Sequence, residues 1–426
     1  MSRLHRYTFL LTAALLPSIV SLAAAQSLQP KTIQFKGDPD HTDAELAEAA
    51  GLKKGATITA ADVNDSAKRL MDTGLFEDIH FNFNGTDLVF QIVPANDLYP
   101  LRLENFPPAI AADADTKLRA RLPLYRGKVP LDGPFTNSVR SALIEELAAK
   151  NIQATISATP YSASGKVAAV SLTITNPEVR VGEIQWNGTS DDLASKARVV
   201  LGQAIGTTYS IGGTSSLLER SLTNFYGERG YLEVKAHATP DTDIAVDPQS
   251  INIPFVVTVD PGPQYKLGAV QLAPDLVVSQ STFDKQSGLR AGSIASLVAL
   301  RTNWTFLVRQ YHNKGYMRAE VISTPTFDRA QHTVNYLVTA VPGPVYNMGT
   351  LRIDNVTDDL RARIQAALKM PAGSTFNEGA VISMTATHDV DPQLERFFTT
   401  VDMHYSIRLH EDTHTVDLVI TLERKH

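Results

Sequence analysis

PEVRVG (Pro177–Gly182), PQYKLG (Pro263–Gly268) and PVYNMG (Pro344–Gly349) share one form. Each reads Pro, any residue, an apolar or aromatic residue, any residue, an apolar residue and Gly, and successive copies are about 80 to 90 residues apart. Pro fixes φ and cannot continue a preceding strand or helix, so the alternating run behind it predicts the first strand of a new unit. The spacing therefore predicts a tandem array of small units.

The N-terminus has the layout of a cleavable export signal. Basic residues precede the apolar stretch 9–20, and Ala23–Ala25 supply an A-x-A cleavage site, so we expect residues 1–25 to be removed. A membrane anchor is the alternative interpretation. It is disfavoured because polar residues interrupt the stretch, which is shorter than the ~20 apolar residues of a spanning helix.

Composition narrows the class of protein further. The chain has 426 residues, too many for one ordinary core, and it has no Cys, so an exported array must depend on apolar packing instead of disulfides. The net charge of −6 is modest for this length, which argues against a nucleic-acid surface or a polybasic membrane patch.

The first unit shows the order of elements most clearly. An alternating run over 31–36 predicts a strand, and the capping box at Thr42–Glu45 predicts a short helix. A second helix begins at Thr59 and ends before Gly74, where a residue with positive φ is expected. Alternation over 79–83, an Asn-Gly turn and a run over 88–93 then predict a hairpin. The unit reads β-α-α-β-β.

The same order returns along the chain. Gly230 and Gly315, each followed by Tyr and an apolar residue, occupy the place of Gly74, so all three are expected to be structural turns. The fifth unit departs from the pattern, because Asp391-Pro392 interrupts its second helix. The predicted divisions are a signal peptide (1–25) and units at 26–96, 97–177, 178–262, 263–343 and 344–426, the last being divergent.

These units resemble the POTRA (polypeptide-transport-associated) domain, the periplasmic module of BamA- and TamA-type barrel-assembly proteins of the outer membrane. The resemblance rests on Ile33–Gly37, on the turn Gly74–Ile79 with the strand after it, and on the Pro-Gly-Pro-x-Tyr-x-x-Gly junctions. It implies an α+β fold in which each unit has a three-stranded mixed sheet with two helices on one face. Too few residues follow Leu422 for one strand of the barrel that the family usually carries, so an array without a β-barrel is expected.

The resemblance also implies a function. It points to a non-enzymatic periplasmic protein, associated with the outer membrane through a partner, that serves outer-membrane protein assembly or protein transport. The implied partners are unfolded or nascent outer-membrane or secreted polypeptides and a separate outer-membrane β-barrel protein. Neither a nucleic acid, a small-molecule substrate, a metal nor a cofactor is expected.

The implied mechanism is β-strand addition. An edge strand presents unpaired N–H and C=O groups that can pair with an extended peptide almost regardless of its sequence. In POTRA relatives this addition is described at the second strand, which here corresponds to residues 79–83, 232–236 and 317–322. The predicted peptide-binding edge residues are Ile79, Phe81, Phe83, Leu232, Val234, Met317 and Ala319. The alternative is that these side chains only pack against the helices.

One stretch carries the spacing of a zinc peptidase. His410-Glu411-Asp412-Thr413-His414 fits H-E-x-x-H, which on a helix places two imidazoles on one face with Glu as the base. Alternating runs enter and leave this stretch, however, so we interpret it as a hairpin turn.

The other alternative to a role in outer-membrane protein assembly is a self-contained periplasmic scaffold for cell-envelope or division proteins. Copurification with an outer-membrane partner would argue against this alternative.

Overall fold

The computed structural model describes residues 27–188, 191–247, 249–386 and 401–424. The predicted signal peptide and the Asp391-Pro392 interruption lie outside these residues. The described chain forms two compact bodies. One runs to Arg180 and includes 208–211 and 242–253, and the other comprises 181–207, 212–241 and the chain from 254 onward. None of the described helices is long and apolar enough to cross a membrane.

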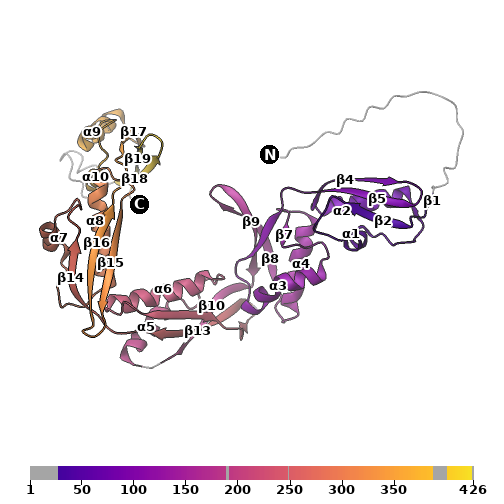
Figure 1. The fold of residues 1–426 in the computed structure, drawn as a ribbon, viewed down its shortest axis with the longest axis horizontal. Helices are drawn as coiled ribbons and strands as arrows, with labels where there is room; N and C mark the ends of the chain where they lie inside the picture. Colours follow the sequence, from indigo (N-terminus) through magenta and orange to yellow (C-terminus); the bar gives the residue numbers. More distant parts are fainter. Residues whose placement is uncertain (1–26, 189–190, 248, 387–400, 425–426) are drawn as a thin grey trace. The chain divides into compact units, whose positions relative to one another are not determined.

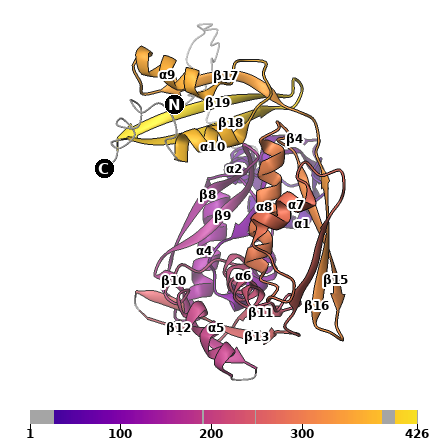
Figure 2. The same ribbon diagram turned by 90° about the vertical axis from the view of Figure 1, so that its left-hand side faces the viewer.

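In the described residues, five sheets of three or four strands follow one another along the chain, each with its own helices (Figures 1 and 2). The first unit contains β2 (Thr32–Lys36), α1 (Asp43–Ala50), α2 (Ala60–Asp72), β4 (Phe76–Phe83) and β5 (Asp87–Pro94), with a side ribbon of β1 (Ser27–Leu28) and β3 (Ile58–Thr59). The second contains β6 (Tyr99–Leu103), α3 (Pro108–Arg121), β7 (Lys128–Val129), α4 (Pro134–Ala148), β8 (Thr155–Ala163) and β9 (Lys166–Asn176).

The third unit contains β10 (Glu178–Asn187), α5 (Asp192–Gly202), α6 (Gly213–Glu228), β11 (Lys235–Pro240), β12 (Ala245–Val246) and β13 (Ser250–Asp260). The fourth contains β14 (Lys266–Leu272), α7 (Gln280–Ser287), α8 (Leu297–His312), β15 (Glu320–Asp328) and β16 (Thr333–Val341). The fifth contains β17 (Asn347–Asp354), α9 (Asp358–Leu368), α10 (Glu378–Ala386), β18 (Val401–His410) and β19 (Thr415–Arg424). The predicted α+β fold is confirmed, whereas the residue boundaries between units stay a prediction. The three-stranded sheet predicted for every unit is wrong for the second and third units, because the short strands β7 and β12 each add a fourth strand to the sheet.

The strand order is the same in the first, fourth and fifth units. The last strand of each lies at the centre, parallel to the first strand and antiparallel to the second: β2-β5-β4, β14-β16-β15 and β17-β19-β18. One face of each central strand is buried. In β19 the residues Val416, Leu418 and Ile420 are fully buried and pack with residues of α9 and α10. The second strand of each unit is therefore a sheet edge.

Helix starts follow the capping chemistry that the sequence predicts. Thr42 and Thr59 each accept a hydrogen bond from the third residue of their helix, and Glu45 and Asp62 bond back to the Thr backbone. A capping residue of this kind stabilises a helix by about 1 kcal/mol. Asn151, which stands where other units have Gly, takes a φ of 61° after α4.

The recurring phrase is explained by backbone pairing. Its last apolar residue, Val181, Leu267 or Met348, donates its N–H to one loop carbonyl and accepts from the N–H of a loop Gly, at 2.7 to 2.8 Å. The Gly that follows is needed for space: a Cβ at Gly268 or Gly349 would lie 2.2 or 2.6 Å from a side-chain oxygen of the central strand. In both units that oxygen accepts the next backbone N–H, at 2.6 and 2.7 Å.

Candidate functional site

The second strand of the first unit, β4, contains the predicted peptide-binding edge residues Ile79, Phe81 and Phe83. It pairs only with β5 among the described strands. Ile79, Phe81 and Phe83 lie opposite Ile92, Phe90 and Leu88, which are almost completely buried on the helix side of the sheet. Phe81 nevertheless remains 38% exposed, with its ring centroid 5.8 Å from that of Phe90. The helices thus cover the middle of this sheet and leave an apolar margin along β4.

The other predicted edge residues lie elsewhere. Leu232 and Val234 come before β11, which begins at Lys235, and Met317 and Ala319 come before β15, which begins at Glu320. The predicted strands over 232–236 and 317–322 therefore start too early. Leu232 packs against the core of the fourth unit, and Met317 is buried in the core of the fifth. The apolar alternation that indicated strands comes from turns that dock on the next unit.

Proline distinguishes the edge strands from one another. Pro160 lies within β8, Pro325 within β15 and Pro240 at the end of β11. Pro has no N–H to offer an added strand, and natural edge strands use it to prevent unwanted pairing. Strands β4 and β18 contain none. Because residues 387–400 before β18 are outside the described chain, β4 is the clearer candidate.

The turns after the second helices form joints with the next unit. Gly230 and Gly315 have φ of 85° and 83°, and Gly74 has 75°, a region that favours glycine. The carbonyls of Gly230 and Gly315 accept from Tyr265 and Tyr346 at 2.8 Å. A Cβ on Gly230 would lie 2.7 Å from the backbone carbonyl oxygen of Tyr265. A Cβ on Gly315 would lie 2.9 Å from that of Tyr346. These two glycines are thus required both by conformation and by the close approach of the next unit.

Each of these joints also contains a side-chain triad. The hydroxyl of the fully buried Tyr265 donates to Glu233, which pairs with Arg329 at 2.6 Å. Arg329, and then the Tyr hydroxyl, lower the pKa of Glu233, while burial and the hydrogen bond to Glu233 raise the pKa of Tyr265. The ionised carboxylate and the neutral phenol are therefore both favoured.

The fifth unit repeats the triad with Tyr346, Glu411 and Arg318. The hydroxyl of Tyr346 donates to Glu411, and Arg318 Nε donates to the same carboxylate at 3.0 Å. The hydrogen bond from Tyr346, and then that from Arg318, lower the pKa of Glu411; the bond to Glu411 and burial raise that of Tyr346. Sequence reasoning missed both triads.

The H-E-x-x-H stretch is a hairpin turn, as the sequence predicts. Strand β18 ends at His410 and β19 begins at Thr415. His410 Nε2 lies 2.7 Å from Asp417, Glu411 is in the triad, and His414 takes a φ of 48° with its ring edge against Tyr346. The three side chains thus have separate partners, and none of the described residues forms a cluster suited to a metal.

The first two units meet through a different set of contacts. Glu45 of α1 pairs with Arg126 at 2.8 Å, and Arg126 Nε donates to the Asp40 carbonyl at the same distance. His41 lies between Asp38 and the Leu124 carbonyl, at 2.6 and 2.9 Å. The backbone N–H of Thr42, and then Arg126, lower the pKa of Glu45 to about 2. Glu45 therefore serves the helix cap and this joint together.

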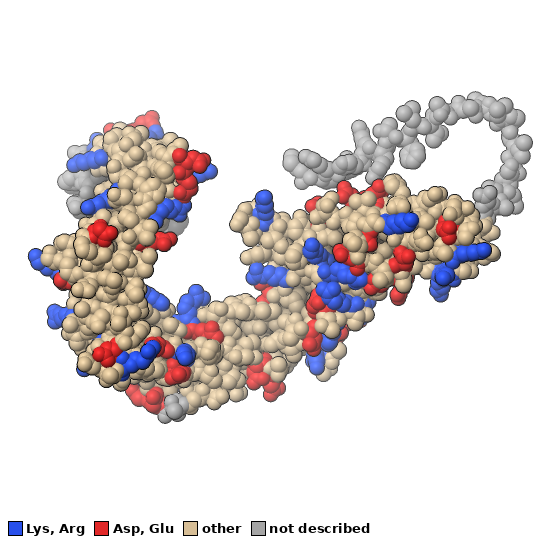
Figure 3. All heavy atoms as spheres, in the orientation of Figure 1, with Lys and Arg blue, Asp and Glu red and all other residues tan. Residues whose placement is uncertain are grey.

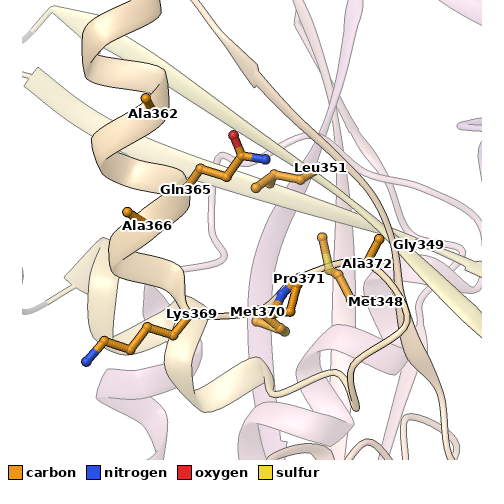
Figure 4. Close-up of a pocket in the computed structure, with 10 residues that line it drawn as sticks. All are labelled: Met348, Gly349, Leu351, Ala362, Gln365, Ala366, Lys369, Met370, Pro371 and Ala372. Atoms are coloured by element: carbon orange, nitrogen blue, oxygen red, sulfur yellow. The ribbon is translucent and has the colours of Figure 1, made fainter.

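A hollow of about 450 Å³ lies beside β17, and Figure 4 shows α9 along one of its sides. Gln365 of the helix points toward Leu351 of β17, while Lys369 points away. Since the N–H and C=O of Met348 are already paired with the loop at 373–374, the strand backbone at this end of the hollow is occupied. Over the face drawn in Figure 3, basic and acidic side chains of the described residues are interspersed.

Comparison with known protein families gives a match to the first unit. Residues 31–95 match the family model POTRA, described as "Surface antigen variable number repeat". The resemblance to POTRA domains is confirmed. POTRA domains are non-enzymatic scaffolds. The match covers the unit that carries β4, the strand with the open apolar margin.

Two curated relatives and one solved structure are similar to parts of the chain. A 62-residue stretch is 42% identical to the outer membrane protein assembly factor BamA of Buchnera aphidicola, covering 15% of this chain and 10% of that protein. A 119-residue stretch is 25% identical to a Treponema pallidum protein named for outer membrane protein assembly, covering 28% and 14%. The matches thus span a small part of those relatives. POTRA domains 3–5 of Haemophilus influenzae BamA align at 15% identity and a TM-score of 0.44, covering 58% of this chain and 96% of that one.

Proposed function

We propose that the chain binds extended segments of outer-membrane or secreted polypeptides by β-strand addition at the outer edge of β4. The observation that carries this proposal is the open margin of that strand, where Phe81 is 38% exposed beside an unpaired backbone edge among the described residues. The function proposed is periplasmic, in outer-membrane protein assembly or transport, together with an outer-membrane partner protein. The predicted export signal and the names of the relatives support this setting.

The chemistry of the edge supports a client that is defined by conformation more than by sequence. An added strand would bond to the free N–H and C=O groups of β4, and its inward side chains would pack on Ile79, Phe81 and Phe83 next to α2. Alternation of apolar and polar residues is typical of strands that are destined for the outer membrane. Such a peptide would place its apolar side chains on the margin and its polar ones on the open face of the sheet.

Prolines in three other second strands restrict where addition can occur. Pro160 and Pro325 each remove a donor from the middle of an edge, and Pro240 removes one at a strand end. We therefore propose β4 of the first unit as the principal site. This narrows the set of edge residues inferred from sequence to Ile79, Phe81 and Phe83.

The proposal can be tested with the full mature chain and a labelled ten-residue peptide of alternating apolar and polar residues. Phe81→Asp places a charge on the margin and is expected to weaken binding, measured by fluorescence anisotropy, by about tenfold. Ile322→Asp is the matched control, because Ile322 is also an exposed apolar residue, 46% exposed, on the edge strand β15. The control should bind the peptide as the unchanged chain does.

Crosslinking in cells tests the client class. A photo-crosslinking residue at Asn82 of β4 should capture outer-membrane or secreted polypeptides, whereas the same residue at Thr326 of the Pro-containing β15 should not. Equal capture at both positions would contradict the choice of β4. Capture of cell-envelope or division proteins alone would instead support the alternative of a self-contained periplasmic scaffold.

A further inference from the structure

The joints after the third and fourth units are built from equivalent positions. Glu233 is the third residue after Gly230, and Arg318 is the third residue after Gly315. On the other side of each joint, Arg329 and Glu411 are the first residues of four-residue turns closed by the pairs Asp328–Thr333 and His410–Thr415. The equivalence is thus set by strand register.

The last residue of each of these turns is also the same. His332 and His414 take φ of 51° and 48°, and their carbonyls accept the N–H that follows each buried Tyr, at 2.9 Å. Both imidazoles lie edge-on to that Tyr, with centroids 6.3 and 5.5 Å apart. The two hairpins therefore present the first turn residue to the preceding unit in the same way.

The charges at these equivalent positions are exchanged. In the joint between the third and fourth units, the preceding unit supplies the carboxylate, Glu233, and the following hairpin supplies the guanidinium, Arg329. In the joint between the fourth and fifth units, the preceding unit supplies Arg318 and the hairpin supplies Glu411. In both, the carboxylate accepts the hydroxyl of a buried Tyr. One geometry is thus built with opposite charge order.

We propose that this exchange makes each docking turn selective for its own neighbour. The turn at 230–234 is a docking surface for a hairpin that begins with Arg, and the turn at 315–319 is one for a hairpin that begins with Glu. Docking the Glu233 turn on the Glu411 hairpin would oppose two carboxylates over one hydroxyl. Docking the Arg318 turn on the Arg329 hairpin would oppose two guanidiniums and leave the buried hydroxyl without an acceptor. The charge order therefore disfavours docking of either turn on the other turn's hairpin.

The pairs are partly exposed, so attraction alone would contribute little. Glu233 has 27% of its side chain exposed and Arg329 71%, while both Arg318 and Glu411 have 56%. What makes the choice of charge consequential is the Tyr hydroxyl, because each Tyr is fully buried and must find an acceptor at this point. A reversal at either position then loses the pair and creates repulsion, and a reversal of the Glu also removes the acceptor of the Tyr hydroxyl.

The test uses the full mature chain with single and double charge reversals. Because the chain has no Cys, cysteines introduced at Ser216 and Thr324 give unique sites for spin labels on the third and fourth units. Glu233→Arg and Arg329→Glu are each expected to broaden the label-to-label distance distribution and to raise protease cleavage in the linker 260–264 by about tenfold. The double variant has the charge order of the next joint, and it should return both readouts to within about twofold of the unchanged chain.

Control and refutation follow from the same variants. Reversal of Asp192 and Lys196, an exposed pair within α5, should leave the joint unchanged whether made singly or together. The proposal is overturned if single reversals leave the distances and cleavage unaltered, or if the double variant is as loose as the single ones. Rescue by the double variant tests the proposal even where a single reversal unfolds the joint. The double variant differs from the single ones only in that it restores charge complementarity.

Discussion

The substitution Gly315→Ala isolates what a single backbone contact contributes to a joint between units. Gly315 has a φ of 83°. A Cβ there would lie 2.7 Å from Thr375 Cγ2, 2.9 Å from the backbone carbonyl oxygen of Tyr346 and 3.1 Å from Val345 Cγ1. Gly373, in the fifth unit, has a φ of 82° with nothing within 4 Å of its Cβ position. The two glycines therefore differ in surroundings while sharing a backbone conformation.

The magnitudes follow from that comparison. An Ala held in the left-handed region costs about 1 kcal/mol at either site. At Gly315 the forced separation of the two units adds about 2 kcal/mol of overpacking and weakened hydrogen bonding. Gly315→Ala should thus destabilise the joint by about 3 kcal/mol and Gly373→Ala by about 1 kcal/mol, a difference of about thirtyfold in a local opening equilibrium.

Amide hydrogen exchange is the suitable assay, because a multi-unit chain has no single free energy of unfolding. The Tyr346 N–H, which donates to the Gly315 carbonyl, should exchange about 150-fold faster in Gly315→Ala and only about fivefold faster in Gly373→Ala. Equal acceleration in the two variants would refute the reasoning, since it would mean that conformation alone accounts for this glycine.

Three further outcomes are expected. Met317→Ala should speed amide exchange in α9, α10 and β19 of the fifth unit more than in its own unit, with a local cost of about 2 kcal/mol; faster exchange confined to β15 and β16 would contradict this. The stabilisation that ionised Glu45 gives to the α1 cap and to the joint with Arg126 should depend on pH. Because the pKa of Glu45 lies at about 2 instead of 4.5, this stabilisation should be complete above pH 4.5 and disappear as the pH falls toward 2. Acid titration followed by circular dichroism should show that Glu45→Gln abolishes this pH dependence. The pH dependence that comes from other groups in the chain should stay intact. Thr59→Ala should destabilise the start of α2 by about 1 kcal/mol, visible as faster exchange of the Asp62 N–H, while the Thr42 cap of α1 stays unchanged.

Local chemistry made much of the fold predictable from sequence. The capping boxes at Thr42 and Thr59 and the turn at Gly74 depend on residues within four positions of one another, so their signals survive in the sequence. The hairpin at 410–415 was also predictable, because alternation on both sides outweighed the spacing of its His residues. Each of these features depends on residues that are close together in the sequence.

The errors lie where a neighbouring unit decides the conformation. Leu232 and Met317 continue an apolar alternation that leads into a strand, yet both are held in turns by contacts with the next unit. The triads were equally hidden, because Arg329 is 96 residues from Glu233 and Glu411 is 93 from Arg318. Charges so far apart give no periodic signal, and only the recurring His at the end of each turn could have aligned the two hairpins.

The two side chains that were wrongly assigned to strands also show how a chain without disulfides holds small units together. Met317 comes from the turn after α8, but it is 7% exposed within a core otherwise made of residues 346–422. Leu232 comes from the turn after α6 and packs on the core built around Tyr265 and Leu307. Each of these cores is therefore completed by a side chain of the preceding unit. A small core gains proportionally more from one added apolar residue than a large one, so folding of each unit stabilises the next. Docking and folding are thus coupled at these joints, and selecting the right neighbour by charge order also selects the side chain that completes the core.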